Sequence, residues 1–150
     1  MSRIYRLSED PDKAVQWLTD ADMIRMPIEI GQILLTVWHR AKPGTFSKVI
    51  EYPDSDPWLE FASASTDNYV ELWNLGMDAM DEHDYRFGSR NINKYRHGMT
   101  ALLNRLQSVP PLPEIGLTEF PLTPEQTQLA YNTEGIFNSY THREVPEWKE

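Results

Sequence analysis

The segment MIRMPIEIGQILLTVWHR, residues 23–40, constrains the fold more than any other part of the chain. Its apolar residues recur at helical spacing and cover most of the circumference, which predicts a helix over residues 21–41. Such a helix has to be buried by other elements of the protein. Because Pro27 lies inside it and has no N–H to donate, we expect a kink or a break near Arg25 and Met26.

The polar side chains of this helix fall on one narrow face, which we call the polar seam. Steps of three and four residues define it as Arg25, Glu29, Gln32, Thr36, His39 and Arg40. Because the rest of the helix is apolar, the seam should look into a cleft or a hydrogen-bonded interior, which makes Glu29 a candidate site carboxylate. The simpler alternative is an ion pair between Arg25 and Glu29 on an exposed edge.

The same periodicity predicts long helices over residues 66–87 and 92–107. Five prolines between residues 109 and 124 predict an extended strap on the surface. FSKVIEY, residues 46–52, is the only candidate strand, and it is short. Shorter helices are expected at residues 8–20, 57–63, 123–126 and 134–142.

These patterns predict a mainly α protein, a compact single-domain helical bundle with a Pro-rich surface strap that spans residues 1–150 as one all-α domain. The absence of cysteine excludes disulfides, zinc–thiolate sites, iron–sulfur clusters and thiol nucleophiles. Charged and polar residues interrupt the longest apolar stretch, and MSRIYRLSEDP lacks the apolar core of a signal peptide. We therefore expect no membrane association and a cytoplasmic location, which is the host cytoplasm if the gene belongs to a phage.

No metal or cofactor is expected. The chain contains no H-E-x-x-H, no phosphate-binding P-loop, no G-x-G-x-x-G after a strand and no G-x-S-x-G. The run DEHD, residues 81–84, is consecutive, so its side chains fan around a helix and cannot converge on one ion. We interpret it as a solvated acidic face.

The net charge of −9 disfavours non-specific binding to nucleic acid. One segment differs, because residues 85–98 contain four basic residues and no acid. Together with basic residues at both ends of the apolar helix and at Lys42, it can form a groove for a phosphate backbone, with Tyr95 or Trp38 stacking on a base. The alternative is a solvated basic helix end. The four basic residues are Arg86, Arg90, Lys94 and Arg96.

LTDADMIRMPIEIGQ, residues 18–32, resembles the early helix of the phage pyrimidine-dimer DNA glycosylases, in which L-x-D-x-H leads to the catalytic Glu. Glu29 falls on that acid, while Asp22 stands at the position of the His. The opening MSRI is also similar to that family, in which Met is removed and the next residue supplies a nucleophilic α-amine. That residue is Ser2 here.

The resemblance implies an all-α enzyme that flips a nucleotide out of duplex DNA with a damaged or modified base. The terminal amine then attacks the sugar C1′ and forms an imine before strand cleavage, so the function expected is that of a DNA glycosylase and lyase. The implied catalytic residues are Ser2 and Glu29. The candidate nucleic-acid-binding residues are Arg3, Arg25, Gln32, His39, Arg40, Arg86, Arg90, Lys94 and Arg96.

A second resemblance is to uncharacterised phage proteins with two similar helices, for which no activity can be carried over. Two alternatives therefore stay open. One is a non-enzymatic acidic phage accessory protein that binds a host protein, and the other is an enzyme that modifies a DNA base without excising it. The residues that carry this resemblance are Asp20, Met26, Glu29, Gln32, Leu34, Arg40, Trp58, Ser65 or Thr66, Asn68, Tyr69 and Leu72.

Overall fold

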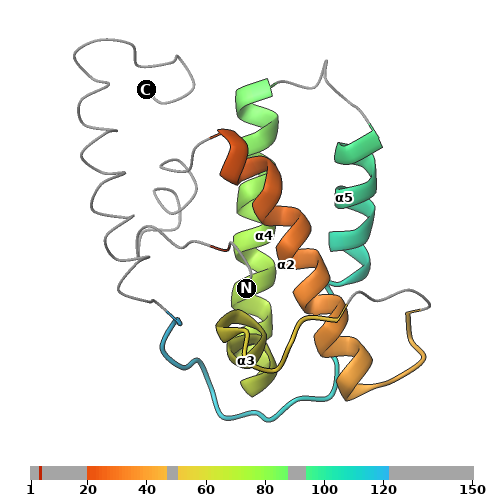
Figure 1. The fold of residues 1–150 in the computed structure, drawn as a ribbon, viewed down its shortest axis with the longest axis vertical. Coiled ribbons are helices and arrows are strands. Elements are labelled where there is room, and N and C mark those ends of the chain that lie inside the picture. The colour runs from red at the N-terminus through yellow and green to blue at the C-terminus, as the bar shows by residue number, and fades with distance from the viewer. Residues whose placement is uncertain (1–3, 5–19, 47–50, 88–93, 122–150) are drawn as a thin grey trace.

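A computed structural model describes residues 4, 20–46, 51–87 and 94–121 of the chain. Four helices occur in this part, and no strand does, so the mainly α prediction is confirmed (Figure 1). The short helices expected at residues 8–20 and beyond residue 122 lie outside the described residues, apart from the first residue of α2. The helices are α2 (Asp20–Ala41), α3 (Pro57–Ala64), α4 (Thr66–Phe87) and α5 (Lys94–Arg105).

Helix α2 lies across α4 and also contacts α3 and α5 (Figure 1). It continues through Pro27 without a break. A proline removes only one helical hydrogen bond. Met26, directly before Pro27, and Ile30, three residues after it, are fully buried, so packing holds the helix together there. A methyl group at Gly76 of α4 would lie 3.0 Å from Ile30 Cγ2, which shows how closely the two helices approach. The expectation of a buried apolar helix is confirmed.

Buried hydrogen bonds join the helices at their lower end. The Trp38 indole N–H donates to the Tyr69 hydroxyl at 2.9 Å, and that hydroxyl donates to the Leu106 carbonyl at 2.7 Å. Burial raises the pKa of Tyr69, so its hydroxyl stays a donor at neutral pH. This chain of bonds connects α2, α4 and the residue that follows α5.

The strap is pinned to the start of α4. Ser65 Oγ accepts from the Asn68 backbone N–H at 3.1 Å and donates to the Gly116 carbonyl at 2.8 Å. The Asn68 amide donates to the Phe61 carbonyl and to Thr118 Oγ1, both at 2.8 Å, and accepts from the Thr118 N–H at 2.9 Å. No helix forms between residues 109 and 121, which confirms the strap over its described part.

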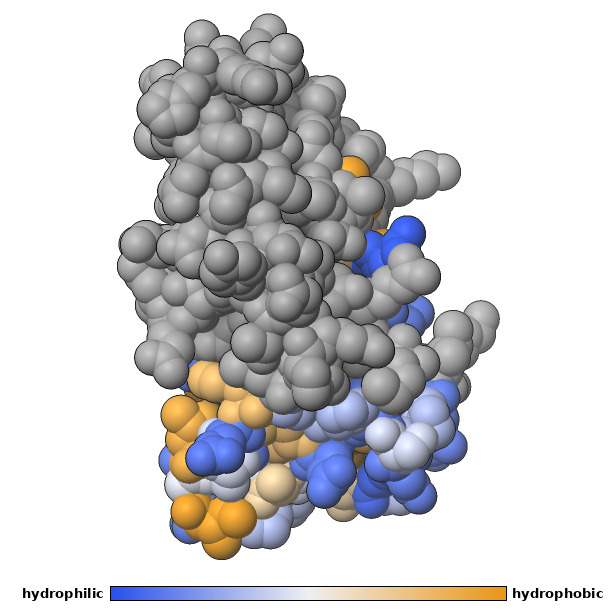
Figure 2. All heavy atoms as spheres, turned by 60° about the vertical axis from the view of Figure 1, so that its left-hand side comes forward, coloured by the Kyte–Doolittle hydropathy of each residue, from blue (hydrophilic) through white to orange (hydrophobic). Residues whose placement is uncertain are grey.

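Apolar residues lie on both sides of the strap. Phe120 packs against the core beside Trp58, whereas Ile115 is 69% exposed and Leu117 is 54% exposed. Figure 2 shows hydrophobic surface beside hydrophilic surface at the lower end of the molecule, where Figure 1 draws the strap. Among the described residues, no helix is long and apolar enough to cross a membrane.

Candidate functional site

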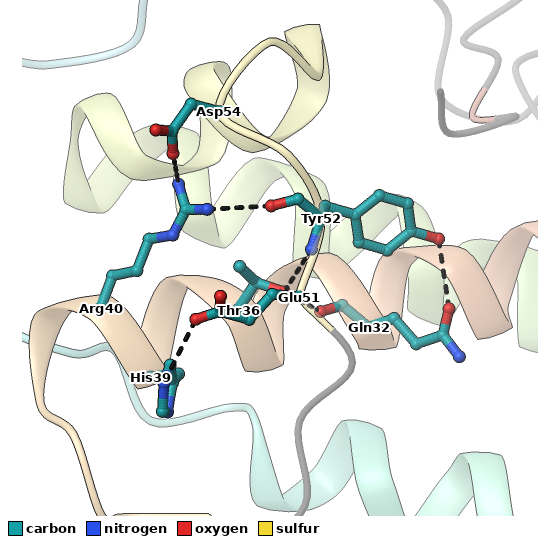
Figure 3. Close-up of polar contacts among 7 residues, drawn as sticks. All are labelled: Gln32, Thr36, His39, Arg40, Glu51, Tyr52 and Asp54. Carbon is teal, nitrogen blue, oxygen red and sulfur yellow. Dashed lines mark hydrogen bonds and ion pairs between the residues drawn. The ribbon is translucent and has the colours of Figure 1, made fainter.

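The polar seam of α2 is covered by the segment that leads into α3 (Figure 3). Tyr52 lies along three turns of the helix. Its hydroxyl donates to Gln32 Oε1 at 3.2 Å and its N–H donates to Thr36 Oγ1 at 3.4 Å. Its carbonyl accepts from Arg40 Nη2 at 2.9 Å. The middle of the seam, at Gln32 and Thr36, therefore meets the hydrogen-bonded environment that the pattern predicts. Arg25, His39 and Arg40 are exposed, so the prediction of an interior is wrong for these residues.

Two ion pairs fix the same segment at the C-terminal end of α2. His39 Nε2 lies 3.2 Å from Glu51 Oε1, and the Arg40 guanidinium contacts the Asp54 carboxylate (Figure 3). The Asp54 side chain is 90% exposed and that of Glu51 is 51% exposed. Water screens exposed pairs of this kind, so each contributes about 0.2–1 kcal/mol.

Glu29 lies near the middle of α2 and is partly buried. Burial of the Tyr52 hydroxyl, together with the negative charges of Glu29 and Asp56, raises the pKa of Tyr52 from 10.0 to about 12. The phenol is therefore neutral over the physiological range. A carboxylate, a neutral phenol and the Gln32 amide thus meet on one side of the helix, where they can donate and accept hydrogen bonds and stabilise positive charge.

The raised pKa of Tyr52 predicts a loss of stability in alkali. The hydroxyl ionises near pH 10 in the unfolded chain and near pH 12 in the folded protein, so its contribution is complete below pH 10 and is lost as the pH rises toward 12. Urea denaturation at pH 9, 10 and 11 should show a smaller fall in unfolding free energy for Tyr52→Phe than for the wild type. Equal falls would contradict the placement of the hydroxyl. The unfolding free energy of both proteins still falls in alkali, because burial also raises the pKa of Tyr69.

The candidate nucleic-acid-binding residues do not all come together. Arg25 is exposed in the second turn of α2, and its backbone lies about 22 Å along the axis from that of Arg40. Arg86 belongs to the end of α4, whereas Lys94 and Arg96 begin α5. These two helix ends lie at the same end of the bundle as the start of α2, opposite His39 and Arg40 (Figure 1). The side chains of Arg86, Lys94 and Arg96, together with Ser2, Arg3 and Arg90, lie outside the described residues.

Near the start of the chain, Ile4 is described, and it is fully buried. It belongs to the same core cluster as Met26 and Ile30, which flank Glu29 in sequence.

The DEHD run is only partly the solvated face that the sequence predicts. Asp81 is exposed and Asp84 is partly exposed, but Glu82 and His83 are 8% and 5% exposed. Four consecutive residues cover all sides of a helix, so two of them face inward here. Within the described ranges, no group of three or more His, Asp or Glu side chains is placed to hold a metal ion.

Sequence patterns gave no indication of Glu51, Tyr52 and Asp54, because this segment has no periodicity that marks a contact with α2. A capping role for Asp56 had a clear signal, since an Asp directly before Pro57 is typical of a helix start. The buried Asp56 carboxylate accepts from the backbone N–H groups of Trp58 and Leu59 at 3.0 and 3.2 Å.

Several residues that carry the second resemblance have structural roles. All five are buried in α3, at the α3–α4 corner or in the first two turns of α4: Trp58, Ser65, Asn68, Tyr69 and Leu72. Ser65 and Asn68 hold the strap, and Tyr69 joins three elements. This half of the resemblance therefore describes packing, whereas the half on α2 contains the polar seam.

Comparison of the chain with models of protein families, with curated proteins and with solved structures found no match. Functional conclusions therefore depend on the residues themselves and on the resemblance of residues 18–32.

Proposed function

We propose that the protein acts on bases of duplex DNA, with Glu29 as the carboxylate at the reacting sugar and the α-amine of Ser2 as the nucleophile. The observation that carries this proposal is the position of Glu29. It is partly buried in the middle of α2, at the acid position of the glycosylase motif, and its charge acts on the neutral Tyr52 hydroxyl. Burial of Ile4 supports it, since Ile4 lies in the core cluster that also contains Met26 and Ile30.

The chemistry needs a nucleophile that is neutral near pH 7. An α-amine has a pKa of about 7.7–8.0, so a useful fraction is unprotonated once Met1 is removed. Its nitrogen forms a bond to C1′ while the C1′–N bond to the base breaks, and the base leaves with the electron pair and a proton. Opening of the C1′–O4′ bond then gives the imine, and O4′ takes a proton.

Glu29 has two roles in this scheme. Its negative charge stabilises the positive charge that develops on the sugar as the base departs. The carboxylate then takes a proton from the attacking nitrogen and delivers that proton to O4′ as the ring opens. The neutral Tyr52 hydroxyl and the Gln32 amide supply hydrogen bonds at the same place.

Borohydride trapping tests the proposal. The mature protein is incubated with an abasic or ultraviolet-damaged duplex, sodium borohydride is added, and a gel is examined for a covalent protein–DNA adduct. We expect an adduct that disappears when the terminal amine is blocked by acetylation. DNA binding without an adduct would instead favour the base-modifying enzyme, which needs no terminal amine.

A second candidate is the acidic accessory protein that binds a host protein. The observation that favours it is the outer side of α4, which carries four acids, while residues 66–85 contain no Lys or Arg. Failure to bind duplex DNA at low salt would support this function over the first. The four acids are Asp67, Glu71, Asp78 and Asp81.

A further inference from the structure

The His39 imidazole and the Arg40 guanidinium at the C-terminal end of α2 are each in contact with a carboxylate from the segment before α3. Glu51 contacts His39 at 3.2 Å, and Asp54 contacts the Arg40 guanidinium (Figure 3). The second Arg40 nitrogen donates to the Tyr52 carbonyl at 2.9 Å. Two carboxylates from one segment thus contact two adjacent N–H-bearing side chains of α2.

A phosphate group can replace these two carboxylates as a partner of Arg40 and His39. Its oxygens carry negative charge and accept the parallel N–H bonds of a guanidinium, and arginine binds carboxylate and phosphate with the same fork. Asp54 is 90% exposed, so its displacement needs no rearrangement of the core. Each exposed pair contributes little to stability, and a phosphate contact of similar geometry replaces it.

We propose that His39 and Arg40 form a phosphate-binding site, that Glu51 and Asp54 close it in the free protein, and that a phosphate group binds by displacing these two carboxylates. The identification of that phosphate as one of duplex DNA rests on the proposed function, but the site itself does not. The carboxyl end of a helix disfavours anions, so binding depends on the Arg40 guanidinium and the His39 imidazole rather than on the helix dipole.

The test compares two double variants with the same loss of negative charge. Glu51→Gln/Asp54→Asn removes the two displaced carboxylates. Glu60→Gln/Asp81→Asn removes one Glu and one Asp that are exposed on α3 and α4. The first probe is tripolyphosphate. Its binding is measured from the change in the NMR signal of the His39 ring. We expect about tenfold tighter binding for Glu51→Gln/Asp54→Asn than for the matched control, since two weak pairs no longer compete.

Addition of Arg40→Gln to Glu51→Gln/Asp54→Asn should abolish the gain. Equal binding by both double variants, or no binding of tripolyphosphate by any of them, would overturn the phosphate site. Thermal unfolding of each variant checks that the fold is intact, which we expect because exposed pairs contribute little to stability.

The second probe is a fluorescent DNA duplex, whose binding is measured by fluorescence anisotropy at low salt. Tighter binding of tripolyphosphate without any duplex binding leaves the phosphate site standing and refutes the proposed function. Duplex binding with a borohydride adduct, but no tightening in Glu51→Gln/Asp54→Asn, refutes the phosphate site and leaves the proposed function standing. Tightening with both probes, together with a borohydride adduct, supports both.

Discussion

Replacement of Glu29 by glutamine is expected to lower the rate of base excision by about 100-fold or more while the protein stays folded. The loss follows because glutamine has neither the negative charge that stabilises the developing sugar cation nor a proton to deliver to O4′. Glu29 is only partly buried, so the amide fits the same space. The measurement is single-turnover cleavage of a duplex with an abasic or ultraviolet-damaged site.

The matched control is Glu60→Gln, which removes a carboxylate that is exposed on α3, and its rate should equal that of the wild type. A second readout does not depend on activity. Because the Glu29 charge helps to raise the pKa of Tyr52, Glu29→Gln should let the Tyr52 phenol ionise at a lower pH. Absorbance at 295 nm measures this ionisation. An unchanged cleavage rate would remove Glu29 from the mechanism, and an unchanged Tyr52 titration would contradict the site geometry.

Asn68→Leu is expected to destabilise the protein by about 3 kcal/mol. The side chain is fully buried and makes three hydrogen bonds, which join α3, α4 and the strap. Leucine has a similar volume but leaves the Phe61 carbonyl and the Thr118 N–H without their partner, and an unsatisfied buried polar group costs about 1–3 kcal/mol. Urea denaturation measures the change in unfolding free energy.

Asn74→Leu is the matched control, because Asn74 belongs to the same helix and is exposed. It should change the unfolding free energy by no more than about 0.5 kcal/mol. If both variants show the same small decrease in unfolding free energy, the hydrogen bonds of Asn68 do not hold the strap in solution.

The helices followed from sequence because their signals are local. The prediction of residues 66–87 coincides with α4, where a polar start is followed by apolar residues at helical spacing. The helix predicted at 92–107 occurs as Lys94–Arg105, and the short one at 57–63 as Pro57–Ala64. Each depends on residues three or four positions apart, which a sequence displays directly.

The surroundings of the polar seam did not follow from sequence. Its pattern predicted that polar groups share one face of α2, and Gln32, Thr36 and Arg40 do contact one segment. What the pattern could not supply was the partner, since Tyr52 lies 20 positions from Gln32 and in a loop without periodicity. Contacts between distant residues depend on how the chain turns, and the turn has no signature in α2.

The attachment of the strap has a consequence for synthesis of the chain. Ser65 and Asn68 bond to residues 50 or 51 positions later, so these bonds form only after that part of the chain has left the ribosome. The rings of Trp58 and Phe61 pack against Phe120, and they lack this contact until then. The nascent protein therefore passes through a stage in which the Trp58 and Phe61 rings are available for contacts with other molecules that the strap prevents in the complete fold.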